Sequence, residues 1–172
     1  MLLSGCAGTE PLPVAAAGAP ATTVRPPPGA QRARVAKVVD GDTLHLVGSG
    51  AGPLRPGVST KVRILGIDTP EVDTYGGQAQ CYGDEAAAFA GAVLREGSTV
   101  QVVGDREAAD RYGRTLLYVW TAEGAFYDEA AVRSGFARAY VVSPNRRYAD
   151  AIRAAERAAR LETRGLWGAC AG

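Results

Sequence analysis

The chain has 172 residues, of which 47% are hydrophobic and 22% charged, a balance typical of one globular domain with its own core. Its formal net charge of +1 excludes the strongly basic surface of a protein that coats DNA. Continuous apolar runs stay well below the ~18 residues that a membrane-spanning helix needs, so the sequence predicts no such helix.

The first 31 residues are expected to lie outside the fold. The sequence Leu-Ser-Gly-Cys at 3–6 resembles the lipobox of bacterial lipoproteins, in which the cysteine, here Cys6, is lipidated. The basic and long apolar regions of a signal peptide are missing before it, so a genuine lipobox would require a start upstream. Residues 10–31 are rich in Pro, Ala, Gly and Thr, as in a spacer. We therefore expect a lipoprotein-like segment and linker over 1–31 and one domain over 32–172, either secreted or lipid-anchored at the bacterial cell envelope.

Five β-rich runs follow in the domain, and the first two are joined by an Asp-Gly-Asp turn. The strands are expected at 34–39, 43–47, 61–67, 99–103 and 115–120. Helices are expected at 84–96, 127–134 and 147–162, and the first should be capped by Asp84 and end at Gly97. Its apolar face should consist of Ala88, Phe89, Ala92 and Val93. This order predicts an α+β fold, a small barrel with helices packed outside it.

The stretch 63–71 presents charges where an apolar strand ends. Pro70 cannot donate a ladder hydrogen bond, so strand pairing should stop near Thr69. Arg63 lies inside this strand, while Asp68 and Glu71 follow it. Two readings are open: a site for a hard metal ion and a phosphate, or a strand end capped by polar turn residues with Arg63 paired internally.

Two other motifs carry charges beside turns. Residues 40–43 read Asp-Gly-Asp-Thr and residues 110–114 read Asp-Arg-Tyr-Gly-Arg. Each alone is more typical of a hairpin turn or of a solvated charge at a strand end. His45 alternates with two leucines and has no second histidine to join it, so we expect a surface residue.

Three cysteines are present, at positions 6, 81 and 170. Cys81 follows the stretch 63–71, called the central stretch below, and Cys170 lies near the end of the sequence. The two are therefore candidates for a disulfide, which would require an oxidising compartment. The alternative is two unpaired, partly buried thiols.

Together, in this order and spacing, the three charged motifs resemble the thermonuclease (staphylococcal-nuclease-like) family, over about 32–167 of the chain. The resemblance implies a five-stranded OB-fold β-barrel with three flanking α-helices. It implies one Ca²⁺ ion held by the carboxylates of Asp42 and Asp68 and the backbone carbonyl of Thr69, with Asp40 supporting through water.

The resemblance also implies roles for the remaining charged residues. Glu71 would deprotonate or orient the attacking water, and Arg63 and Arg114 would bind the phosphate oxygens on which charge grows. Substrate-binding residues would be Arg111, Tyr112 and Tyr140, although core packing is an alternative for Tyr140. The family has a second tyrosine where this chain has Val142, and a peptide that can be cis at Ser143-Pro144.

The expected activity is a calcium-dependent endonuclease that acts as a monomer on DNA and RNA and leaves 3′-phosphate ends, with membrane contact only through a lipid anchor at Cys6. A non-catalytic nucleic-acid-binding module of the same fold is the alternative. The presence of all five ionised residues, Asp42, Arg63, Asp68, Glu71 and Arg114, disfavours that alternative. A surface-anchored structural domain would not explain charges clustered around turns.

Overall fold

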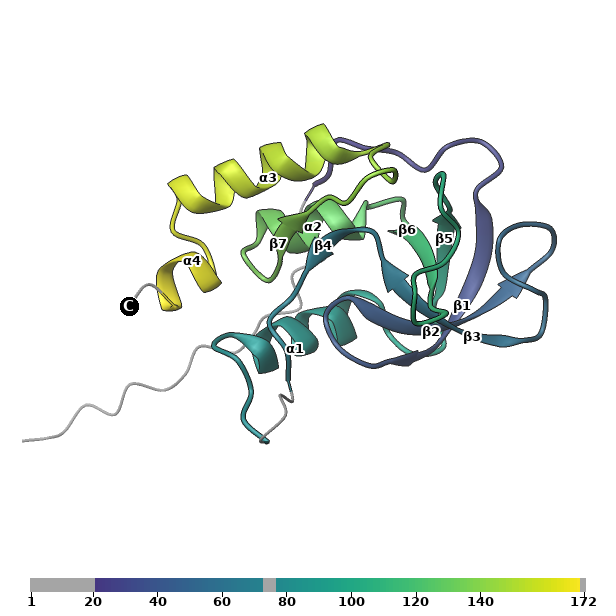
Figure 1. The fold of residues 1–172 in the computed structure, drawn as a ribbon, viewed down its shortest axis with the longest axis horizontal. Coiled ribbons are helices and arrows are strands. Elements are labelled where there is room, and N and C mark those ends of the chain that lie inside the picture. The colour runs from purple at the N-terminus through teal and green to yellow at the C-terminus, as the bar shows by residue number, and fades with distance from the viewer. Residues whose placement is uncertain (1–20, 73–76, 171–172) are drawn as a thin grey trace, which may run out of the picture.

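Five strands close into a barrel in the computed structural model, which describes residues 21–72 and 77–170 (Figure 1). They follow one another around the barrel as β1 (Gln31–Val38), β2 (Thr43–Ser49), β3 (Ser59–Ile64), β6 (Thr115–Thr121) and β5 (Thr99–Val103). Neighbouring strands are antiparallel except β3 and β6, which run parallel. Closure leaves the sheet without free edges, and it confirms the expected α+β class and five-stranded barrel.

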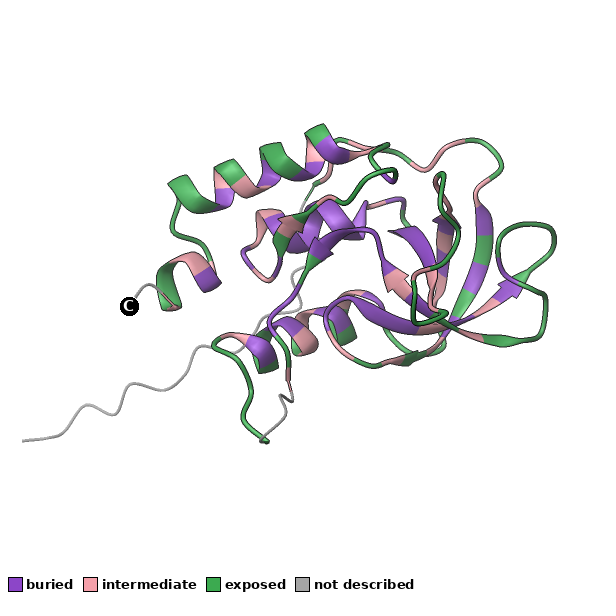
Figure 2. Cartoon of the chain, viewed as in Figure 1, coloured by how far each residue is buried: buried purple, intermediate pink, exposed green. Residues whose placement is uncertain are grey.

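Alternating side chains fill the barrel interior. In β1, Ala33 and Val35 are buried between exposed neighbours, and in β2 Leu44 and Leu46 are buried on either side of the half-buried His45 (Figure 2). This period of two is what a strand with one buried face requires. Strand β6 is instead buried from Leu116 onwards, because helices cover its outer face.

Helices pack on one side of the barrel: α1 (Gly83–Val93), α2 (Tyr127–Arg133), α3 (Ala149–Leu161) and the short α4 (Leu166–Ala169). Two details of the expected first helix were wrong. Its N-cap is Tyr82 in the left-handed region, with Asp84 already in the first turn, and two residues of the expected apolar face, Ala88 and Ala92, are exposed. The fully buried stripe is Ala86, Ala90 and the adjoining Leu94, four residues apart, and the expected Phe89 and Val93 pack beside it, partly buried against the core.

The expected strand 61–67 is two strands. Gly66 adopts a φ of 77°, and a Cβ there would lie 2.5 Å from Ile152 Cδ1, so the chain turns closely against α3 at this glycine. Beyond it, β4 (Gly66–Asp68) leaves the barrel and pairs with β7 (Arg138–Tyr140). The turn carries the end of the central stretch to the junction between barrel and helices.

Contacts hold both ends of the described part of the chain to the domain. Part of the segment assigned to the linker packs on it: Thr23 Oγ1 donates to the Glu129 carboxylate at 3.0 Å, and Trp120 Nε1 donates to the Val24 carbonyl at 3.1 Å. Cys81 and Cys170 form a disulfide with their Cα atoms 5.9 Å apart. Cys6 and the lipobox lie outside the described residues. Among the helices of the described ranges, none is long and apolar enough to cross a bilayer.

Candidate active site

The turn between β1 and β2 is built around Asp42. Its Oδ2 accepts hydrogen bonds from the Thr69 backbone N–H at 3.0 Å and the Thr69 hydroxyl at 3.2 Å. A Cβ on Gly41 would lie 2.5 Å from Thr69 Cγ2, so only glycine lets the two segments approach this closely. The Tyr127 hydroxyl fixes the same turn by donating to the Gly41 carbonyl at 2.6 Å. Asp42 and Thr69 are both buried, so the turn and the central stretch form one rigid unit.

Arg63 ties this unit together from the end of β3. Its Nη2 lies 3.1 Å from Asp42 Oδ2 and 2.9 Å from Asp68 Oδ1. Its Nη1 donates to the carbonyls of Ile64 and Ile67 at 2.7 and 2.8 Å. The guanidinium is therefore paired internally, as one of the two readings of the sequence expected, and the same pairing brings the two carboxylates together.

Glu71 lies beside this group. Partial loss of water around the Glu71 carboxyl raises its pKa, and nearby negative charges raise it further while Arg63 lowers it. Those negative charges are the carboxylates of Asp40, Asp42 and Asp68. Glu71 therefore senses the charge of three other acids, and Arg63 pairs with two of these, Asp42 and Asp68.

The donor set suits a hard divalent ion completed by water. Within the described ranges, no three His, Cys, Asp or Glu side chains are gathered so that they could hold a metal ion. Two carboxylates do converge on a single positively charged nitrogen, Arg63 Nη2, and hard ions prefer carboxylate and carbonyl oxygens. Asp40 also holds the turn, since its Oδ1 accepts the N–H of Asp42 at 2.9 Å. The residues that fit such an ion are therefore Asp42 and Asp68, with the carbonyl of Thr69 following directly.

A cavity of about 440 Å³ opens beside Arg63 and brings together the other predicted site residues. Arg111, Tyr112, Arg114 and Tyr140 all line it. Arg114 Nε lies 2.7 Å from Asp110 Oδ2, and Asp110 Oδ1 also accepts the backbone N–H groups of Tyr112 and Arg114. Burial raises the pKa of Asp110, but these hydrogen bonds outweigh it and the net shift is downward. Asp110 thus stays ionised and holds Arg114 at the cavity wall.

Aromatic side chains form the exposed lip of the cavity. Tyr112 is 68% exposed and has the guanidinium carbons of Arg111 and Arg114 at 4.8 and 5.6 Å from its ring centre. Tyr140 is 57% exposed, so core packing does not account for it. Val142 lies on the same rim and is also exposed, and the Ser143-Pro144 peptide beyond it is cis.

Two residues that sequence reasoning missed hold the site in place. Gln80 clamps Glu71: its N–H donates to the Glu71 carbonyl at 2.8 Å, and its Oε1 accepts the Glu71 N–H at 3.0 Å. Asn145, buried in the loop before α3, bonds both backbone groups of Glu107 at the cavity edge. No local pattern marks either residue, because each acts across a loop closure.

Comparisons with known proteins identify the family of the chain. Residues 61–169 match the model of the family described as staphylococcal nuclease homologue. The chain is 34% identical over 137 residues to a thermonuclease of Staphylococcus hyicus, covering 80% of this chain and 76% of that protein. It is 35% identical over 133 residues to a thermonuclease of Staphylococcus intermedius, with coverages of 77% and 74%. It is 30% identical over 132 residues to the endonuclease YncB of Bacillus subtilis, with coverages of 76% and 59%. The chain therefore belongs to the staphylococcal nuclease homologue family and is a nuclease, a hydrolase.

Proposed function

We propose that this nuclease is a calcium-dependent endonuclease that hydrolyses phosphodiester bonds of DNA and RNA and leaves 3′-phosphate ends. The observation that carries the proposal is the position of Arg63. It pairs with Asp42 and Asp68 and also lines the cavity that Arg114 lines. Arg63 thus contacts the two acids that suit a hard ion and also lines the cavity. The wall of that cavity, which we call the catalytic groove, is cationic and aromatic.

The chain's own residues divide the chemistry between them. A Ca²⁺ ion held by Asp42, Asp68 and the Thr69 carbonyl would withdraw charge from the phosphodiester and favour attack by water. Glu71, with its raised pKa, orients or deprotonates that water. Arg63 and Arg114 neutralise the phosphate oxygens as phosphorus becomes five-coordinate.

The cavity rim supports binding of nucleotides on either side of the bond. Tyr112 and Tyr140 are exposed rings on which bases can stack, and each stacked base contributes ~1–3 kcal/mol. With Val142 in place of a second tyrosine on the segment after α2, we expect weaker nucleotide binding rather than loss of cleavage.

The disulfide supports a position outside the cytoplasm. Disulfides persist in oxidising compartments, so the Cys81–Cys170 bond suits a secreted or envelope-anchored enzyme that acts as a monomer. Attachment to the membrane through Cys6 remains a proposal that rests on the lipobox alone.

The test is a cleavage assay with identified product ends. The purified chain is incubated with single-stranded DNA, duplex DNA and RNA, in Ca²⁺, in Mg²⁺ and in excess chelator. We expect cleavage of all three in Ca²⁺, 3′-phosphate ends and no cleavage in chelator. Undiminished cleavage in chelator would refute the metal's role, and 5′-phosphate ends would refute the direction of cleavage.

A further inference from the structure

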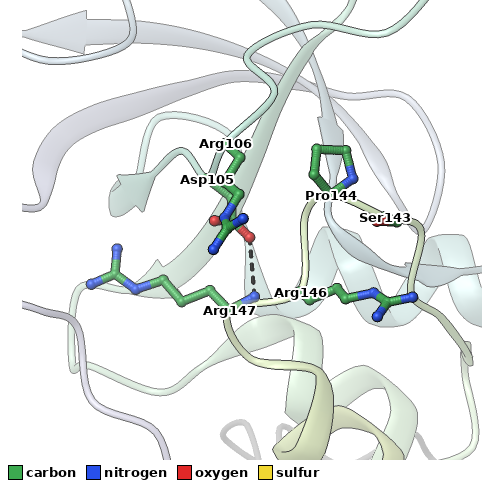
Figure 3. Close-up of a pocket in the computed structure, with 6 residues that line it drawn as sticks. All are labelled: Asp105, Arg106, Ser143, Pro144, Arg146 and Arg147. Atoms are coloured by element: carbon green, nitrogen blue, oxygen red, sulfur yellow. Dashed lines mark hydrogen bonds between the residues drawn. The ribbon is translucent and has the colours of Figure 1, made fainter.

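A second cavity of about 420 Å³ lies at the cis Ser143-Pro144 peptide, and none of its lining residues lines the first cavity (Figure 3). It is formed where the loop between β5 and β6 meets the loop that leads into α3. Its lining residues are Asp105, Arg106, Ser143, Pro144, Arg146 and Arg147. Three of the lining residues are arginines and one is an acid, so the lining carries a net positive charge, although Figure 3 shows the Arg146 and Arg147 side chains extending in opposite directions.

The single acid does not neutralise the arginines. Asp105 Oδ2 accepts the backbone N–H of Arg147 at 3.0 Å and lies 3.3 Å from the Tyr118 hydroxyl. In the part of the chain that the structure describes, no carboxylate lies within ion-pair distance of the Arg106 or Arg146 side chain. Both residues are exposed. Uncompensated arginines grouped at a concave surface favour an anionic ligand, and the planar guanidinium suits phosphate in particular.

This cavity lies next to the catalytic groove, and a clamp, the hydrogen-bonded pair of Asn145 and Glu107, separates the two. Asn145 Oδ1 accepts the Glu107 N–H at 2.8 Å, and Asn145 Nδ2 donates to the Glu107 carbonyl at 3.1 Å. Both clamp residues line the catalytic groove, and each is followed or preceded in the chain by an arginine of the second cavity, Arg146 or Arg106. The same two loops therefore build both cavities, and the clamp fixes one relative to the other.

We propose that this arginine pocket binds a backbone phosphate of the nucleic-acid strand at a position outside the bond that is cleaved. The proposal rests on the proposed nuclease function, because a strand lying in the catalytic groove would continue past Asn145 onto the pocket. The pocket then selects polynucleotides over short fragments. It contributes to substrate affinity and leaves the chemical step unchanged.

The test measures binding without cleavage. A fluorescent single-stranded oligonucleotide, long enough to cover both cavities, is titrated with the chain in chelator at several salt concentrations. The test variant is Arg106→Ala with Arg146→Ala. The matched control is Arg153→Ala with Arg157→Ala, which removes the same charge from exposed positions on α3. Each lost phosphate contact should reduce the slope of log K against log salt by about 0.7, so the test variant, which loses the one phosphate of the pocket, should lose about 0.7 and the control nothing.

Kinetics then separates this pocket from the catalytic site. For the test variant we expect a raised KM and an unchanged kcat on the long oligonucleotide, and unchanged constants on a dinucleotide. A wild-type salt slope in the test variant, or an equal loss in the control, would overturn the pocket. If the wild type cleaves nothing, the proposed function fails, but the slopes still decide whether the pocket binds phosphate.

Discussion

Position 41 requires glycine because the Thr69 side chain lies very close to its Cα atom. Its missing Cβ is what allows Thr69 to reach the Asp42 carboxylate, since any Cβ there would overlap the Thr69 side chain. The sequence predicted a turn at this point from the Asp-Gly pair, but it could not show what packs against the glycine.

Gly41→Ala should therefore destabilise the fold by about 1–3 kcal/mol, the usual cost of overpacking, and should weaken Ca²⁺ binding by displacing Asp42. Gly91→Ala is the matched control, because nothing lies within 4 Å of a Cβ at that exposed helical position. It should stabilise by roughly 0.5–1 kcal/mol. Urea unfolding measures both, and equal effects of the two changes would contradict this role for Gly41.

Glu71 is the residue whose function depends most on its charge. Glu71→Gln keeps the size of the side chain and the backbone clamp by Gln80, but it removes the carboxylate. Loss of a general base lowers turnover by about 10²–10⁴-fold. The free energy of unfolding should not fall, because the raised pKa of Glu71 means that its negative charge does not stabilise the fold. Glu85→Gln, at an exposed position on α1, should keep wild-type kcat. A kcat for Glu71→Gln within a few-fold of the wild-type value would remove Glu71 from the mechanism.

The charged motifs were readable from sequence because each is local, within five residues of a turn. The contacts that bring these motifs together could not be read from the sequence. The pairing of Arg63 with Asp42 depends on the register of β2 against β3, where Thr43 lies opposite Arg63. Gln80 contacts Glu71 from a position nine residues further along the chain, and such a contact leaves no periodic signal in the sequence.

At the scale of elements, α2 buries an acid in its first turn. Asp128 is fully buried; its Oδ2 accepts the Val119 N–H at 3.2 Å, while no hydrogen bond to Oδ1 occurs within the described residues. Burial raises the pKa of Asp128 well above its usual value, partly offset by its hydrogen bonds and by Arg63. The protonated form is therefore favoured in the folded state.

This burial makes stability depend on pH. A raised pKa in the folded state gives stability that is complete below about pH 4 and declines as pH rises towards the folded pKa, by up to ~1.4 kcal/mol per pH unit. Asp128→Asn cannot ionise, so the free energy of unfolding of the variant minus that of wild type should increase as pH rises. Urea unfolding from about pH 4 to 9 measures this difference. With the exposed Asp150→Asn as control, a flat difference for Asp128→Asn would contradict a raised pKa.

The disulfide connects two elements that flank the site. It joins Cys81, next to the Gln80 clamp, to Cys170 directly after α4. Cys81→Ser with Cys170→Ser should lower the free energy of unfolding by about 2–4 kcal/mol and reduce kcat by loosening Glu71. Reduction of the wild type should reproduce both effects. Unchanged stability on reduction would show that the bond contributes nothing in solution.

Short elements were the part of the fold that the sequence did not predict. β4 and β7 have three residues each and α4 has four, too few to show a period. The break at Gly66 was hidden for the same reason, because an apolar run on both sides reads as one strand. These small pieces nevertheless carry Asp68 and Tyr140 to the site.

For the whole molecule, the order of strands and helices was enough to predict a barrel with helices outside it. Composition was a poor guide on the N-terminal side, where the Pro- and Ala-rich residues 10–31 were all assigned to a spacer. A few hydrogen bonds fix part of it to the domain, among them the contacts of Thr23 with Glu129 and of Val24 with Trp120. Composition indicates whether a segment can form a core of its own. It does not indicate whether the segment packs on a domain that is already folded.

Calcium binding measured by isothermal titration calorimetry tests the central claim most directly, because its readout does not depend on catalysis. The account predicts one Ca²⁺ per wild-type chain and loss of binding in Asp42→Asn with Asp68→Asn. Asp150→Asn, exposed on α3, should bind as wild type does. Unchanged stoichiometry and affinity in the double variant would contradict the assignment of these two carboxylates as the core of the active site.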